Sequence, residues 1–239
     1  ANQFLEYASF TNDQEKYVRQ ATLEFKYWNI KNELPKYKKL IAQFRSLDNA
    51  TTEDDIDDIY QQGMILANNT REFFLPQIVE FCKTITNEQV EEMATYFDDL
   101  MKERKLELEN DEDDLQGSLI KSFKRFFRFM GVKLSNEQIN TIQTLSSGIE
   151  DKREQLISER IQWNKQFIAI LELRQNENFE ERFISHINSL DSEDPKTRIM
   201  INKITAEIIA SLSEKQRGKF QKRLVRFESS IDQIIEKQN

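Results

Sequence analysis

Apolar residues recur at helical spacing along most of the chain, and no long segment alternates apolar and polar residues with the period of a strand. This pattern predicts an all-α protein with about eight helices. The predicted helices span residues 12–47, 53–83, 87–108, 115–130, 136–174, 179–190, 196–210 and 214–237.

Proline, glycine and one regular spacing refine this picture. Pro35 and Pro76 fall inside predicted helices and are expected to kink them. Gly131 follows the helix 115–130, where a left-handed cap residue belongs. The helix 136–174 is the longest and carries apolar residues seven positions apart, which predicts one narrow seam along a rod. The seam residues are Ile142, Ile149, Leu156, Trp163 and Ile170.

Two polar stretches are predicted to link helices. Residues 109–114 are almost entirely acidic, and carboxylates without partners are costly to bury, so this stretch is expected in solvent. Residues 192–195 read Ser-Glu-Asp-Pro, which is typical of a turn.

One short motif occurs four times: an apolar residue, Thr or Ser, two mostly polar residues, and Gln. It is the signature of a capping box, in which the hydroxyl oxygen accepts from the backbone three residues on and the Gln side chain accepts from the cap residue's own N–H. The motif therefore predicts four helix starts. The hydroxyl and glutamine pairs are Thr11 and Gln14, Thr86 and Gln89, Ser135 and Gln138, and Ser213 and Gln216.

The spacing of the motifs indicates an internal repeat. The first two motifs lie 75 residues apart and the last two lie 78 apart, whereas 49 residues separate the second from the third. We infer a diverged tandem duplication, with helical halves at 1–114 and 115–239 that form one continuous structural unit.

Composition narrows the function classes. The chain has 34 basic and 42 acidic residues, and its net charge of −8 disfavours nucleic-acid binding. Its five glycines are scattered singly, which disfavours loops that cradle phosphate. With one histidine, His186, and one cysteine, Cys82, the sequence supports no catalytic site, no metal site and no cofactor. A lone cysteine also does not distinguish the cytosol from the periplasm.

Several conspicuous residues have simple structural interpretations. The acidic run 54–58 lacks the spacing, the central Gly and the distal Glu of a calcium loop, and is expected to be the first turn of a helix. Cys82 is expected to be a small buried apolar side chain and His186 a packed or surface residue. Trp28 and Trp163 are expected to anchor the core at corresponding places in the two halves.

The segment 121–130 has the most distinctive chemistry, because cations and aromatic rings occupy different faces of one predicted helix. If exposed, it would bind a protein client or an anionic membrane, since cations attract at long range and aromatic rings supply adaptable apolar area. The alternative is an ordinary buried helix with a solvated basic face. The candidate client-binding residues are Lys121, Lys124, Arg125, Phe126, Phe127, Arg128 and Phe129.

The paired motifs resemble the L-T-x-x-Q motifs of the Spy and CpxP type of small helical periplasmic proteins, most clearly over residues 134–224. Over the whole chain the sequence is similar to a bacterial lipoprotein family of unknown function. That similarity rests on the four motifs, on Trp28 with the segment 33–37 after it, and on a second tryptophan in the segment 160–163. Ser replaces Thr in the later motifs, and no lipid-bearing cysteine precedes Ala1.

The resemblance implies a non-enzymatic periplasmic protein, anchored to a membrane through a lipidated N-terminus that this chain does not contain. Spy-type proteins are ATP-independent chaperones whose paired subunits form a cradle. Two such halves in one chain would form a comparable elongated or cradle-like structure as a monomer that binds unfolded or envelope clients. The alternative is a structural adaptor that docks on one specific folded envelope partner.

Overall fold

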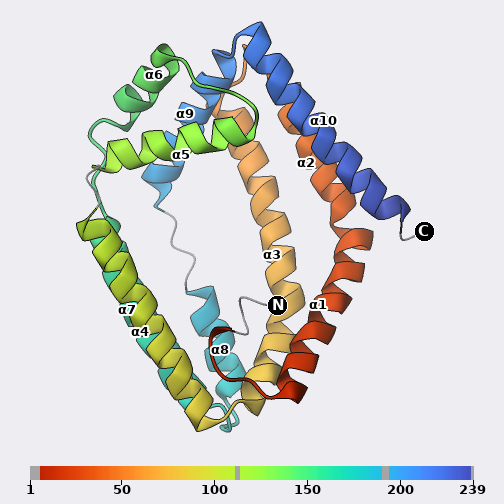
Figure 1. The fold of residues 1–239 in the computed structure, drawn as a ribbon, viewed down its shortest axis with the longest axis vertical. Coiled ribbons are helices and arrows are strands. Elements are labelled where there is room, and N and C mark those ends of the chain that lie inside the picture. The colour runs from red at the N-terminus through yellow and green to blue at the C-terminus, as the bar shows by residue number, and fades with distance from the viewer. Residues whose placement is uncertain (1–5, 111–113, 190–193, 238–239) are drawn as a thin grey trace. The chain divides into compact units, whose positions relative to one another are not determined.

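The computed structural model describes residues 6–110, 114–189 and 194–237. These residues form ten helices and no strand, which confirms the all-α prediction (Figure 1). The helices are α1 (Asn12–Asn32), α2 (Leu34–Ser46), α3 (Glu53–Thr84), α4 (Asn87–Glu109), α5 (Leu115–Phe129), α6 (Asn136–Ser146), α7 (Arg153–Glu172), α8 (Phe179–Asn188), α9 (Pro195–Ala210) and α10 (Glu214–Glu236).

The described chain has ten helices where about eight were predicted, because two predicted helices are each divided. The predicted helix 12–47 ends at Asn32 and restarts at Leu34, so the chain breaks near Pro35 where a kink was expected. Pro35 lies in the first turn of α2, where a missing N–H costs no helical hydrogen bond. Pro76, in contrast, lies inside α3, which continues through it.

The prediction of one long helix at 136–174 is wrong. The chain forms α6 and α7 instead, and Gly148, between them, has a φ of +83° that a right-handed helix cannot accommodate. The seven-residue seam does not form, since Ile142 is fully buried whereas Leu156 is 55% exposed.

Half of each predicted link lies outside the described part of the chain, namely 111–113 and 192–193. The residues that follow them cap helices. The Asp114 carboxylate accepts from the Gly117 N–H at 2.8 Å and begins α5, and the Asp194 carboxylate accepts from the Thr197 N–H at 3.3 Å and begins α9.

The chain divides into two compact units, and each draws segments from both sides of residue 114. The units therefore do not coincide with the halves 1–114 and 115–239, and the tandem duplication stays a prediction about ancestry. Unit 1 consists of Ala1–Lys26, Thr70–Glu112 and Asp151–Ser192, and unit 2 of Tyr27–Asn69, Asp113–Glu150 and Glu193–Asn239.

Unit 1 has its own apolar core, in which α4 packs along α7 and α8 closes against α7. The fully buried Phe183 packs on Phe167, whose ring stacks on that of Trp163 with 5.2 Å between centroids. The Trp163 indole N–H donates to the His186 carbonyl at 3.2 Å, and the His186 Nε2 lies 3.0 Å from the Trp163 carbonyl oxygen. His186 is thus a packed residue that joins α7 to α8.

Unit 2 has a second core, formed by α2, α5, α6, α9 and α10 with part of α3. Its fully buried side chains include Phe127, Ile142, Ile204 and Ile208. At the end of α5 the Val132 N–H donates to the Phe127 carbonyl at 2.7 Å. This bond closes a left-handed cap of the kind predicted at Gly131, whose φ is +82°.

Gly131 and Gly218 offer a matched pair of substitutions in unit 2. A Cβ at Gly131 meets only ordinary contacts at 3.8 Å, so Gly131→Ala should cost roughly 1 kcal/mol through its positive φ alone. A Cβ at Gly218, inside α10, meets nothing within 4 Å, so Gly218→Ala should stabilise by about 0.5 to 1 kcal/mol. Denaturant unfolding of both variants checks this, and equal effects would contradict it.

Candidate functional site

All four repeated motifs begin helices, and each makes both hydrogen bonds of a capping box. In the first motif the Gln14 N–H donates to the Thr11 hydroxyl at 3.3 Å, and the Thr11 N–H donates to the Gln14 Oε1 at 2.9 Å. The motifs at Thr86, Ser135 and Ser213 make the same pair of bonds. They begin α4, α6 and α10 respectively.

The glutamines of the first two motifs also bind each other. Gln14 Nε2 donates to Gln89 Oε1 at 3.0 Å, and Gln89 Nε2 donates to Gln14 Oε1 at 2.8 Å. Gln14 Nε2 also donates to the Thr84 carbonyl at 3.1 Å, and Gln89 Nε2 also donates to the Ser9 carbonyl at 2.9 Å. Each of these carbonyls lies two residues before the cap residue of the other motif. We call this reciprocal pair, which ties the starts of α1 and α4 within unit 1, a glutamine clasp.

Unit 2 contains a second glutamine clasp with the same bonds. Gln138 Nε2 lies 3.4 Å from Gln216 Oε1, and Gln216 Nε2 donates to Gln138 Oε1 at 3.0 Å. As in unit 1, each glutamine also donates to the carbonyl two residues before the partner motif's cap residue. Gln138 Nε2 donates to the Ser211 carbonyl at 3.3 Å, and Gln216 Nε2 donates to the Lys133 carbonyl at 2.8 Å. Sequence analysis located the four caps and missed their pairing, for which the intervals of 75 and 78 residues were the available signal.

The clasps are structural devices. Gln14, Gln89 and Gln138 are each less than 9% exposed, and their amide groups are occupied by one another and by the backbone. An amide side chain is neither protonated nor deprotonated at neutral pH, so a clasp is not suited to act as a general acid or base. Its role is to hold two helix starts together.

The predicted client-binding segment lies in α5, and its aromatic residues divide between the core and the surface. Phe127 is fully buried and stacks on Phe220 of α10. It belongs to the core of unit 2 and cannot touch a client, which corrects its place among the candidate residues. Phe126 and Phe129 are 45% and 56% exposed. The predicted cations Lys121, Lys124, Arg125 and Arg128 are all exposed.

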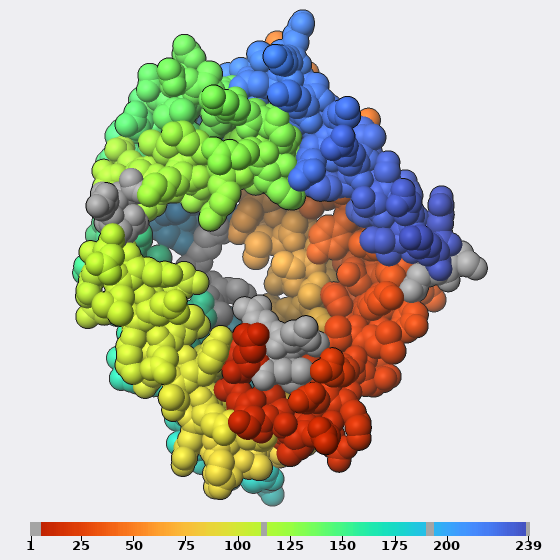
Figure 2. All heavy atoms as spheres, viewed as in Figure 1, coloured from red at the N-terminus to blue at the C-terminus, as the bar shows by residue number. Residues whose placement is uncertain are grey.

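Helix α10 extends this surface, which sequence analysis did not foresee. The Phe129 ring stacks on that of Phe227 with 5.7 Å between centroids. The Arg223 guanidinium lies 4.7 Å from the centre of the Phe129 ring and 5.3 Å from that of Phe227, within the range of a cation–π contact. In Figure 2, the C-terminal end of α5 (green) lies against α10 (blue) on the visible face. No spacing in the sequence relates residue 129 to residue 227.

We define the α5–α10 face by the exposed cations and rings of α5 together with the one cation and the one ring of α10 that contact Phe129. Its members are Lys121, Lys124, Arg125, Phe126, Arg128, Phe129, Arg223 and Phe227.

The α5–α10 face is positively charged in a chain that is acidic overall. Lys124, Arg125 and Arg128 form no ion pair within residues 6–110, 114–189 and 194–237, and residues 115–134 contain no carboxylate. On α10, Glu228 pairs with Arg45 at 2.6 Å and Asp232 pairs with Lys38 at 2.5 Å. These carboxylates are thus already neutralised within unit 2.

Charge is also distributed unevenly between the units. Unit 1 holds 14 basic and 24 acidic residues and unit 2 holds 20 and 18, so their formal charges are −10 and +2. A face rich in cations on unit 2 would therefore attract acidic partners at low salt in spite of the net charge of the chain.

The other conspicuous residues have structural roles. Cys82 is buried, which raises the pKa of its thiol to about 12 and keeps it protonated and unreactive. Near the start of α3, the Asp55 carboxylate accepts from the backbone N–H and the hydroxyl of Thr52, and these bonds lower the pKa of Asp55. In the part of the chain that the structure describes, no three histidine, cysteine or carboxylate side chains converge as metal ligands.

The fold and its surfaces define an all-α protein built on paired capping boxes. None of the described helices combines the length and the apolar character that a membrane span requires. The chain belongs to a family of unknown function, DUF6279, whose model matches residues 6–193. No match was found among curated proteins or among solved structures.

Proposed function

We propose that this protein is a non-enzymatic helical protein of the cell envelope that binds unfolded or envelope client proteins as an ATP-independent chaperone. The observation that carries the proposal is the α5–α10 face, where Phe126 and Phe129 are exposed among cations. The cations attract acidic client segments, and the rings then contact apolar side chains. Such binding needs no cofactor and releases its client readily.

The resemblance to Spy-type proteins supports the same proposal from another direction. The four motifs of this sequence resemble the L-T-x-x-Q motifs of those chaperones, and here they join in the two glutamine clasps. By the same resemblance, we propose a periplasmic location and a lipid anchor at an N-terminus ahead of this chain. We also propose a monomer, because two halves in one chain would take the place of the paired subunits. Nucleic acid is not a partner in this proposal, because the net charge is −8.

A charge-reversal variant tests the proposed surface. Replacing Lys124, Arg125 and Arg128 by glutamate should raise, by roughly fivefold, the amount of protein needed to halve the aggregation of an acidic client, followed by light scattering. It should also remove most of the salt dependence of the suppression, because screening at 0.15 M leaves an electrostatic reach of about 8 Å.

The matched control reverses Lys26, Lys165 and Arg182, three exposed cations of unit 1, which changes the net charge by the same amount. This control should suppress aggregation as the wild type does. If both triple variants lose activity equally, net charge and not the α5–α10 face is responsible. If the wild type suppresses no aggregation and a pull-down recovers one stoichiometric folded partner, the protein is a structural adaptor instead.

A further inference from the structure

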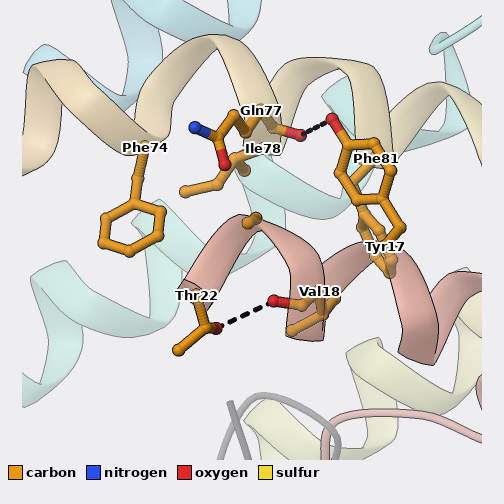
Figure 3. A pocket seen from close by; sticks show the side chains of 8 residues that line it. Tyr17, Val18, Thr22, Phe74, Gln77, Ile78 and Phe81 are labelled. Carbon is orange, nitrogen blue, oxygen red and sulfur yellow. Dashed lines mark hydrogen bonds between the residues drawn. The ribbon is translucent and has the colours of Figure 1, made fainter. Parts of the chain in front are cut away.

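Unit 1 contains an open pocket that no part of the proposed function uses. It lies between the portions of α1 and α3 that belong to unit 1 and has a volume of about 210 Å³ (Figure 3). Its walls are mainly apolar and include Val18 and Ala21 from α1, and Phe74, Ile78 and Phe81 from α3. No charged side chain lines it, so it suits an uncharged ligand.

The hydroxyl donors that line the pocket are already in use. The Tyr17 hydroxyl donates to the Gln77 carbonyl at 3.2 Å, and the Thr22 hydroxyl donates to the Val18 carbonyl at 2.8 Å (Figure 3). Burial raises the pKa of Tyr17, so this hydroxyl keeps its proton at neutral pH. The Gln77 Nε2 donates to the Phe73 carbonyl at 3.4 Å. One hydrogen of the Gln77 amide nitrogen and the hydroxyl and amide oxygens keep hydrogen-bonding capacity for a ligand.

One acceptor in the lining has no partner. The Gln77 Oε1 is buried and makes no hydrogen bond, although the side chain lies on the side of α3 that faces the pocket (Figure 3). A buried acceptor without a donor is unfavourable, and a ligand that supplies one recovers that loss. The amide is held only by the long bond to Phe73, and its terminal torsion is soft, so the oxygen can turn towards a ligand.

We propose that this pocket binds a neutral aromatic ring that carries one N–H or O–H donor, as in indole or phenol. The Gln77 amide oxygen would accept the donor hydrogen, and the rings of Tyr17, Phe74 and Phe81 would contact the ligand ring at its edge or face. An apolar cavity of roughly 150 Å³ is sufficient for benzene. The volume of 210 Å³ accommodates one or two fused rings.

The same ring chemistry has two sources, a free small molecule and the tryptophan side chain of a protein. Titrations of the isotope-labelled protein with indole, with indene and with N-acetyltryptophanamide, followed by amide NMR shifts, distinguish them. Indole and indene share a shape, but only indole has an N–H donor. We expect indole to bind roughly 2- to 10-fold more tightly than indene, with the largest shifts around Ala21 and Ile78.

Two variants locate the site and its acceptor. Ala21→Phe fills the pocket and should abolish binding of both ligands, whereas Leu23→Phe, on α1 at a side chain that is 43% exposed, should leave binding unchanged. Gln77→Leu should retain binding of indene and reduce the affinity for indole to that for indene. Binding of N-acetyltryptophanamide with the same sensitivity to Ala21→Phe would identify a protein side chain as the source, and binding of indole alone would identify a free molecule.

The proposal fails if neither indole nor indene shifts the pocket amides, if Ala21→Phe binds them as the wild type does, or if indole keeps its advantage over indene in Gln77→Leu. None of these outcomes bears on client binding, because the pocket residues lie in unit 1 and the α5–α10 face lies in unit 2. Unchanged circular dichroism of Ala21→Phe checks that the variant is folded.

Discussion

Replacing Gln89 by leucine is expected to lower the free energy of unfolding by roughly 3 kcal/mol. The Gln89 amide makes four hydrogen bonds: it accepts from Thr86 N–H and Gln14 Nε2, and it donates to the Ser9 carbonyl and to Gln14 Oε1. A net hydrogen bond contributes about 0.5 to 1.5 kcal/mol, and a buried partner left without one costs more. Gln89 is only 4% exposed, so water cannot replace the lost bonds.

Denaturant unfolding measures this loss, and hydrogen exchange at the start of α4 localises it. Gln155→Leu is the matched control, because Gln155 is an exposed glutamine of unit 1 whose amide bonds only to Glu159, and it should change stability by less than about 0.5 kcal/mol. Gln14→Leu together with Gln89→Leu should cost clearly less than the sum of the single changes, since each alone leaves the other unpaired. Additive effects would mean that the clasp does not act as a unit.

The same comparison in unit 2 should give a smaller loss for Gln216→Leu. Gln216 is only partly buried, and the bond from Gln138 Nε2 to Gln216 Oε1 is 3.4 Å long, against 2.8 and 3.0 Å in unit 1. A longer and more hydrated hydrogen bond contributes less to stability. The two clasps thus share one pattern of bonds but differ in how far they exclude water.

The features that the sequence predicted well are local. A capping box involves residues three positions apart, and a left-handed cap needs one glycine at the end of a helix, so Thr86 with Gln89 and Gly131 are recognisable in a short window. The clasp between Gln14 and Gln89 spans 75 residues and depends on how two helices meet. Nothing local to either motif specifies a partner.

The break in the predicted helix 136–174 shows that apolar periodicity alone does not locate helix ends. The helical spacing of apolar residues continues from α6 into α7 across Gly148, and this suggested one long helix. The continuity is coincidental, because α6 packs in unit 2 and α7 packs in unit 1. A single glycine with a positive φ outweighed that pattern. Two of the unit boundaries could not be predicted either, because they fall inside α1 and α3, where no linker marks the change.

The sequence predicted which residues of α5 carry cations and aromatic rings, but not which of the rings face the core. Phe126 and Phe127 are adjacent, and a helix turns by about 100° per residue, so their side chains must diverge. Which of them faces the core depends on α10, whose Phe220 stacks on Phe127. Tertiary packing therefore decided which ring a client could reach.

Substitutions at Phe126 and Phe127 are expected to differ strongly in their effect on the free energy of unfolding. Phe127→Ala should lower the free energy of unfolding by about 3 to 5 kcal/mol, because it removes a fully buried ring and leaves a cavity that the surrounding helices fill only partly. Phe126→Ala removes a ring that is 45% exposed and should cost less than about 1.5 kcal/mol. Equilibrium unfolding of both variants, followed by circular dichroism and by hydrogen exchange in α5, measures the difference.

The same pair separates stability from binding. Phe126→Ala should weaken suppression of client aggregation while the fold remains intact, because the ring belongs to the α5–α10 face. Phe127→Ala should loosen unit 2 and leave exchange in the core of unit 1 close to that of the wild type, since the buried residues form a separate cluster there. Equal destabilisation by both variants would place Phe126 in the core and remove the aromatic component of the proposed binding surface.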